Sequence, residues 1–62
     1  MAEVYEYQPH GLLRKRVRDI ASGVEGELMA VIAEGTTDIA YIRKSDGREF
    51  TTAAANLQAA GR

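Results

Sequence analysis

The chain alternates short apolar runs with turn-forming residues. Between residues 16 and 50, residues that favour turns recur at close intervals. These turn signals are Ser22-Gly23, Gly26, Gly35-Thr36-Thr37-Asp38 and Asp46-Gly47. Short apolar runs that are separated in this way are typical of the strands of a small sheet or barrel. The pattern therefore predicts an all-β fold.

The first apolar run predicts a strand over residues 16–21. Alternate residues of a strand point to opposite faces, so Val17 points to the core while Arg16 and Arg18 point to solvent. Asp19 then falls on the Val17 face, which predicts a bulge or the end of the strand near this residue. We expect its carboxylate to accept hydrogen bonds from amides of the turn that follows.

The second run, residues 27–34, is ambiguous because its Leu, Met, Ala and Glu residues are also good helix formers. Its spacing from the neighbouring turns matches the short strands of barrels, and Gly26 and Gly35 bound it on both sides. A continuous apolar stretch of this length fits a strand that is buried on both faces. We therefore predict a strand.

The next two runs predict a hairpin over residues 37–52. Ala40 and Ile42 share one face of the first strand, and we expect them to point to the core. Asp46-Gly47 favours a type I′ turn between the strands. Phe50, the only phenylalanine of the chain, is expected to anchor the core from the returning strand.

The C-terminal residues carry a weaker pattern. Residues 53–62 are rich in alanine and favour one or two helical turns, with Thr52 available as the N-terminal cap. Leu57 is the only sizeable apolar residue after the hairpin, so we expect it to close the bottom of the barrel.

The N-terminal residues 1–12 are expected to form a tail. Alternatively, Val4-Tyr5-Glu6-Tyr7 forms a short edge strand, because valine and tyrosine suit a pleated surface and Pro9 would end it. Under either interpretation, residues 13–62 form one small β-barrel domain.

Four segments carry a resemblance to a known group of proteins. They are Val17-Arg18-Asp19-Ile20-Ala21-Ser22-Gly23, Gly26-Glu27-Leu28-Met29, Ala40-Tyr41-Ile42-Arg43 and Gly47-Arg48-Glu49-Phe50. In this order they resemble small single-domain proteins of actinomycetes and their mobile elements. The resemblance implies a small SH3-like five-stranded barrel with a short helical turn near the C-terminus, and it implies no activity. Lys44 and Phe50 depart from the pattern, in which proline and tryptophan are common.

The length of 62 residues limits the chain to one small domain. A chain of this size buries only about 60% of its unfolded surface, so it lies close to the limit of stability. Because the chain has no cysteine, no disulfide supplements its core. We therefore expect a partner or a second copy to cover part of the surface.

Charge and hydropathy restrict the location and the partners. The first ten residues lack the basic start and long apolar stretch of a secretory signal. The longest apolar run, residues 28–33, is far shorter than the roughly 18 residues of a membrane span. We expect a cytoplasmic protein that does not cross a membrane. A net charge of −1 gives no overall attraction to nucleic acid, so such binding would need a local patch.

Few residues offer catalytic chemistry. His10 is the only histidine, and we expect it to be solvated. Ser22 and Ser45 lie beside turn signals with no second histidine to form a triad. A barrel this small has little room for a ligand pocket of the usual ~300 Å³ or more. The sequence therefore predicts no enzyme activity, no bound metal and no cofactor.

The strongest candidate for a binding site is basic. Its residues are Arg14, Lys15, Arg16, Arg18, Tyr41, Arg43 and Arg48. If these side chains share one face, they form an arginine and tyrosine patch able to contact phosphates and stack on bases. The alternative is that the cations pair across the sheet with Asp19, Glu27, Glu34 and Glu49.

Two functions remain in competition. The leading prediction is a non-enzymatic module that binds protein, itself included, through an exposed sheet face and edge. Apolar residues that one small barrel would leave uncovered, namely Met29, Ile39 and Tyr41, favour it. The alternative is a nucleic-acid-binding regulatory barrel that uses the basic patch.

Overall fold

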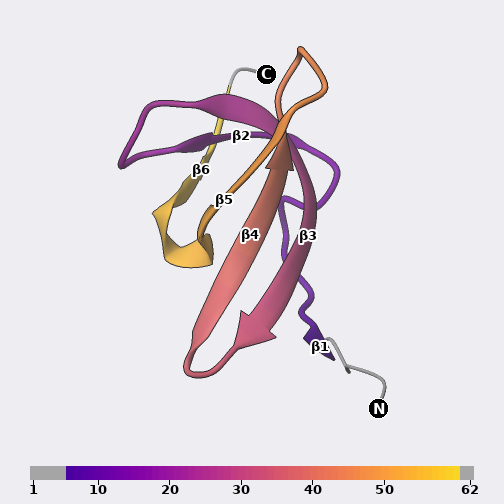
Figure 1. The fold of residues 1–62 in the computed structure, drawn as a ribbon, viewed down its shortest axis with the longest axis vertical. Helices are drawn as coiled ribbons and strands as arrows, with labels where there is room; N and C mark the ends of the chain where they lie inside the picture. Colours follow the sequence, from indigo (N-terminus) through magenta and orange to yellow (C-terminus); the bar gives the residue numbers. More distant parts are fainter. Residues whose placement is uncertain (1–5, 61–62) are drawn as a thin grey trace.

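The computed structural model describes residues 6–60, and almost all of its regular structure is strand (Figure 1). The elements are β1 (Glu6–Tyr7), β2 (Arg16–Asp19), β3 (Glu25–Glu34), β4 (Thr37–Arg43), β5 (Glu49–Ala53), the 3-10 turn η1 (Ala54–Asn56) and β6 (Leu57–Ala59). The predicted all-β class is confirmed. Within the described residues, no helix has the length and apolar character needed to span a bilayer.

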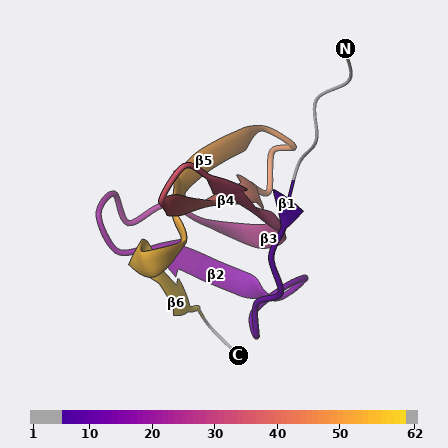
Figure 2. The same cartoon turned by 90° about the horizontal axis from the view of Figure 1, so that it is seen from below.

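The strands form one antiparallel sheet in the order β5-β4-β3-β2-β6, with β1 also paired to β3. β3 is central because its ten residues pair with three strands. Its first three residues pair with β2, Ile32 and Ala33 pair with β1, and β4 runs along its other side. The sheet curls but does not close, so β5 and β6 are its two ends (Figure 2). The SH3-like barrel thus stays a prediction.

The concave side of the curled sheet holds the core. Its fully buried members are Val17, Leu28, Val31, Ala40 and Ile42. The inward positions predicted for Val17, Ala40 and Ile42 are confirmed. Phe50 and Leu57 also point inward but are only half-buried, and they pack against this core instead of forming its centre.

β3 is a strand, as predicted, and it contains a bulge. Its register against β4 shifts between Leu28 and Ala30, so Met29 is the extra residue. Val31 and Ile32 follow on opposite faces, and both are buried, at 2% and 8% exposure. Burial on both faces holds for this pair only, since the residues on either side are half-buried.

Gly26 lies inside β3 and not in a turn, which corrects the prediction from its residue type. A Cβ at this position would collide with the carbonyl oxygen of Arg43 and would lie 2.8 Å from Cγ2 of Ile42. Glycine is therefore required because β4 crosses close to the β3 backbone.

The β4–β5 hairpin has a different turn from the one predicted. A type I′ turn needs positive φ at both central residues, but within residues 6–60 Arg14 is the only non-glycine residue with positive φ. Gly47 has φ 87°. The Gly47 N–H donates to the Lys44 carbonyl at 2.9 Å, and the Lys44 N–H donates to the Arg48 carbonyl at 2.7 Å. This is a three-residue loop with a bulge at Gly47.

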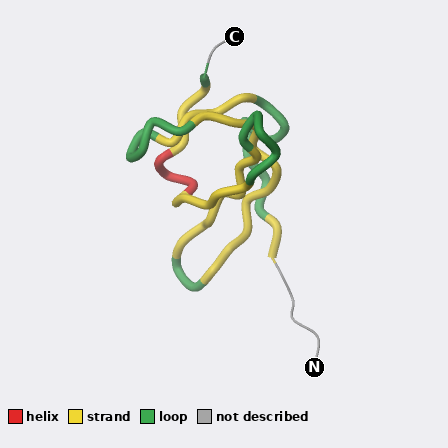
Figure 3. Tube along the Cα trace, turned by 45° about the horizontal axis from the view of Figure 1, so that its top comes forward, coloured by secondary structure: helices red, strands yellow, loops and turns green. Residues whose placement is uncertain are grey.

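The predicted C-terminal helix is reduced to one 3-10 turn, shown in red in Figure 3. The predicted cap is wrong: Ala53 is the N-cap residue, and no side chain caps the turn. The chain then enters β6, a strand that the alanine-rich sequence did not predict. β6 pairs with β2, and this long-range pairing overrides the local helix propensity of the segment.

The N-terminal segment joins the sheet through β1, whose Tyr7 pairs with Ile32. The edge-strand alternative therefore holds for Glu6–Tyr7, while Val4 and Tyr5 lie outside the described residues. Leu12 packs against the core as a partly buried side chain, which corrects the prediction that residues 1–12 are a tail at this position.

Candidate interaction surface

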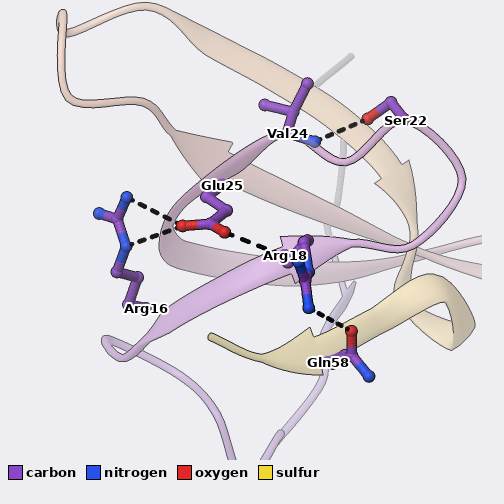
Figure 4. Close-up of polar contacts among 6 residues, drawn as sticks. All are labelled: Arg16, Arg18, Ser22, Val24, Glu25 and Gln58. Atoms are coloured by element: carbon purple, nitrogen blue, oxygen red, sulfur yellow. Dashed lines mark hydrogen bonds and ion pairs between the residues drawn. The ribbon is translucent and has the colours of Figure 1, made fainter. Parts of the chain in front are cut away.

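Arg16 and Arg18 project from β2 to the convex side of the sheet, as predicted, and Glu25 of β3 lies between them (Figure 4). Arg16 donates to Oε1 of Glu25 through Nε at 3.3 Å and Nη2 at 3.1 Å. Arg18 Nη1 is 4.0 Å from Oε2 of the same carboxylate, and its Nη2 donates to Oε1 of Gln58 at 3.2 Å. One carboxylate thus serves two arginines.

Three of the other predicted cations, Arg14, Arg43 and Arg48, are also near carboxylates. Arg14 Nε is 3.3 Å from Oε2 of Glu27, and Arg43 Nη2 is 3.7 Å from Oε2 of Glu49. Arg48 Nε lies 4.0 Å from Oδ2 of its hairpin neighbour Asp46. The side chains in these pairs are exposed, so each pair adds little stability, but each reduces the free positive charge.

The strand register accounts for two of these ion pairs, because Arg18 and Glu25, and Arg43 and Glu49, are direct partners on neighbouring strands. Arg16, Glu27, Arg43 and Glu49 are consecutive partners on β2, β3, β4 and β5, so charges alternate in one row across the sheet. Opposite charges that face each other on neighbouring strands attract. The predicted basic residues of β2 and β4 are therefore brought to one face but are separated by acids. Lys15 precedes this row, exposed in the turn before β2.

The alternative of cross-sheet ion pairing is confirmed for Glu27 and Glu49. Glu34 instead accepts a hydrogen bond from the Tyr41 hydroxyl at 3.1 Å. Tyr41 pairs with Ala30 on the far side of the β3 bulge, so its ring and the β2 arginines belong to different rows. Glu25 and Asp46, which provide three of the contacts above, were not predicted as partners.

Asp19 is not part of the charged surface, because it is buried at 4% exposure. It accepts hydrogen bonds from the Ser22 hydroxyl at 2.6 Å, the Ser22 amide at 3.2 Å and the Thr52 hydroxyl at 2.9 Å. The first of these lowers the Asp19 pKa most; burial raises it, and the other hydrogen bonds lower it further. The predicted role in the Ser22 turn is confirmed, and the bond to Thr52 links β2 to β5.

Two large apolar side chains are exposed among the described residues: Tyr7 at 68% and Ile20 at 58%. The predicted surplus residues Met29, Ile39 and Tyr41 are instead half-buried. Alternation along residues 16–20 places Ile20 on the same face as Arg16 and Arg18, so the sequence already indicated that Ile20 is exposed. The exposure of Tyr7 depends on how β1 docks, which the sequence does not show.

An open groove of about 520 Å³ lies where the β3–β4 turn approaches η1. Its walls include His10, Asp38 and Ala54. This corrects the expectation that so small a domain lacks a hollow of that size. It also corrects the expected solvation of His10, which is half-buried and accepts a hydrogen bond from the Leu12 amide at its Nδ1, at 3.1 Å.

Within residues 6–60, no three acidic or histidine side chains lie close enough to form a metal site. Comparison of the chain with protein families, curated proteins and solved structures finds no match.

Proposed function

We propose that this protein is a non-enzymatic interaction module that binds protein through an open edge of its sheet and the adjoining convex face. In this proposal the curled sheet is a variant of the SH3-like barrel, and its open edge is the binding element. The observation that carries the proposal is β5, a five-residue end strand with a neighbour on one side only. Unpaired edges of this kind bind extended segments of other chains.

The surface charges favour protein over nucleic acid as the partner. Nucleic-acid binding draws on cations that are free to replace counterions at phosphates. Here Arg14, Arg16, Arg18, Arg43 and Arg48 each lie within 4.0 Å of a carboxylate. A phosphate would have to compete with these acids, so the nucleic-acid-binding barrel is the weaker candidate.

The proposal is tested by two binding measurements on the intact chain, each at about 50 mM and about 500 mM salt. The first selects ligands from a display library of random peptides and, in parallel, measures self-association by sedimentation. The second titrates labelled single-stranded and duplex oligonucleotides by fluorescence anisotropy. We expect protein association that persists at high salt, because apolar and backbone contacts are little screened.

Two results would contradict the proposal. One is tight oligonucleotide binding that falls steeply with salt and is lost in the double variant Arg16→Glu, Arg18→Glu. The other is the absence of both self-association and any selected peptide.

A further inference from the structure

The outer edge of β5 has a defined pattern of hydrogen-bonding groups. Residue pairs in an antiparallel ladder alternate between pairs that exchange both hydrogen bonds and pairs that exchange none. The Lys44 N–H donates to the Arg48 carbonyl at 2.7 Å, so this pair, at the hairpin end, is a bonded one. Because bonded and non-bonded pairs alternate from this pair onward, Phe50 and Thr52 are the β5 residues whose backbone groups bond to β4.

A contact on the other side of the sheet gives the same result. The Val31 carbonyl accepts a hydrogen bond from the backbone N–H of Gln8 at 2.7 Å. The backbone polar groups of Val31 therefore point away from β4. Its partner Ala40 must therefore direct its own groups to β5, where it pairs with Thr52. Both observations therefore identify Ala40 and Thr52 as a hydrogen-bonded pair.

The N–H and C=O groups of Glu49, Thr51 and Ala53 consequently point away from β4, into the open edge. Among residues 6–60, none of the backbone hydrogen bonds of turns and loops involves these three residues. Ala53 is also the N-cap residue of η1, so its carbonyl accepts the first hydrogen bond of that turn. Glu49 and Thr51 therefore offer both backbone groups to a new strand, and Ala53 offers its N–H. The edge therefore presents a ready template for another strand.

β5 is also the longest open edge in the described part of the chain. The other edge strands, β6 and β1, have three and two residues. Protected edges usually carry several charged side chains, above all lysine, or proline or a bulge. β5 has one charge, Glu49 at its first residue. β5 has the sequence Glu-Phe-Thr-Thr-Ala, which contains neither proline nor lysine, and its pairing with β4 is uninterrupted.

We propose that β5 pairs with β5 of a second copy of this chain, antiparallel, about a two-fold axis at Thr51. The inference rests on the proposed function and names the partner of its open edge. In this register Thr51 faces Thr51 of the second copy, and Glu49 of each chain faces Ala53 of the other. All three outward-pointing residues then lie in bonded pairs.

This register is self-complementary in charge, as a two-fold interface requires. Glu49 is the only charged residue of β5, and its new neighbour is an alanine. The row that contains Arg43 and Glu49 therefore continues into Ala53 and Ile39 of the second copy, with no like charges opposed. A foreign peptide has no such built-in match.

The dimer is expected to be weak. Five residues per chain bury less area than the 1,200–2,000 Å² of a standard interface. We expect a dissociation constant between about 1 µM and 1 mM. Sedimentation of the full chain from about 10 µM to about 1 mM should show the mean mass rise toward twice the chain mass.

Two threonine variants test the position of the interface. Thr51→Lys places like charges opposite each other on the axis and should weaken the dimer at least about tenfold. Thr37→Lys is the matched control, because Thr37 is also an exposed strand threonine but lies on β4 beyond the end of β5. It should leave the dissociation constant within about twofold of wild type. Circular dichroism checks that both variants fold.

A cross-link tests the register. The chain has no cysteine, so Thr51→Cys introduces a single thiol at the axis. Cα atoms of a bonded antiparallel pair are about 5.5 Å apart, which is within disulfide range. Oxidation should convert this variant to a covalent dimer, whereas Thr37→Cys should stay uncrosslinked at the same concentration.

The outcomes separate this inference from the proposed function. A wild-type mass that does not change with concentration overturns pairing with a second copy, and peptide selection then still tests the module. Self-association that survives Thr51→Lys unchanged also overturns the β5 interface, but it supports a protein-binding function through another surface.

Discussion

Asp19 is the buried charged residue among residues 6–60, and its three hydrogen bonds make it a structural group. The Thr52 hydroxyl that reaches it belongs to a residue 33 positions away, on the end strand β5. A local helix cap by Thr52 was expected, but a buried carboxylate without donors would cost more than an uncapped 3-10 turn at the surface. The hydroxyl therefore serves Asp19.

The Asp19 carboxylate gives stability a defined pH dependence. Its pKa is lower in the folded chain than in the unfolded chain, mainly because of the Ser22 hydroxyl. The stabilisation is therefore fully present above the unfolded pKa of about 3.9 and is lost as the pH falls through the folded pKa. We expect Asp19→Asn to lower the urea midpoint at pH 7, and the difference from wild type to shrink below about pH 4.

Urea titrations between about pH 7 and about pH 2 check this expectation. Asp38→Asn, at an exposed aspartate of β4, is the control and should change the midpoint at pH 7 less. A difference between wild type and Asp19→Asn that grows as the pH falls would show that the carboxylate does not stabilise the fold in this way.

At the scale of elements, β3 organises the molecule because β1, β2 and β4 all pair with it. Its continuous apolar run was enough to predict a strand. The same run gave no indication of the bulge at Met29 or of the close crossing at Gly26. Both features depend on where β4 lies, which is a property of the assembled sheet.

The crossing predicts a large cost for Gly26→Ala. The new methyl group would meet the Arg43 carbonyl and the Ile42 side chain, and the backbone can yield only by separating β3 from β4. We expect a loss of about 1–3 kcal/mol or more in the free energy of unfolding. Gly11→Ala is the matched control, because nothing lies within 4 Å of the added carbon. Chemical denaturation compares the two, and equal stability would refute the crossing.

At the scale of the whole molecule, the stability margin is small. Proteins gain roughly 0.05–0.15 kcal/mol of net stability per residue, so 62 residues give about 3–9 kcal/mol. The fully buried core has five members, and the half-buried side chains around it are more tolerant of change. The proposed pairing with a second copy would add burial to this small margin.

The burial ranking predicts different costs for two core substitutions. Ile42→Ala removes a side chain with 0% exposure and should cost about 2–5 kcal/mol, enough to unfold much of the population. Phe50→Ala should cost less despite the larger side chain, because Phe50 is only half-buried. Thermal and urea denaturation measure both, and a larger loss for Phe50→Ala would place the centre of the core at β5.

The sequence by itself determined the all-β class, most strand positions and the inward faces of Val17, Ala40 and Ile42. These follow from period-two alternation and from turn residues, which act over a few positions of the chain. The presence of basic residues on the convex face was also predictable for the same reason.

Only the tertiary structure decided which groups meet across the sheet. The β2–β6 pairing, the Asp19–Thr52 hydrogen bond and the acidic partners of the arginines all join residues distant in the sequence. Such contacts depend on strand order and register, which local patterns do not specify. The same is true of β5: alternation predicted a strand, but the open sheet made it an edge with its backbone groups exposed.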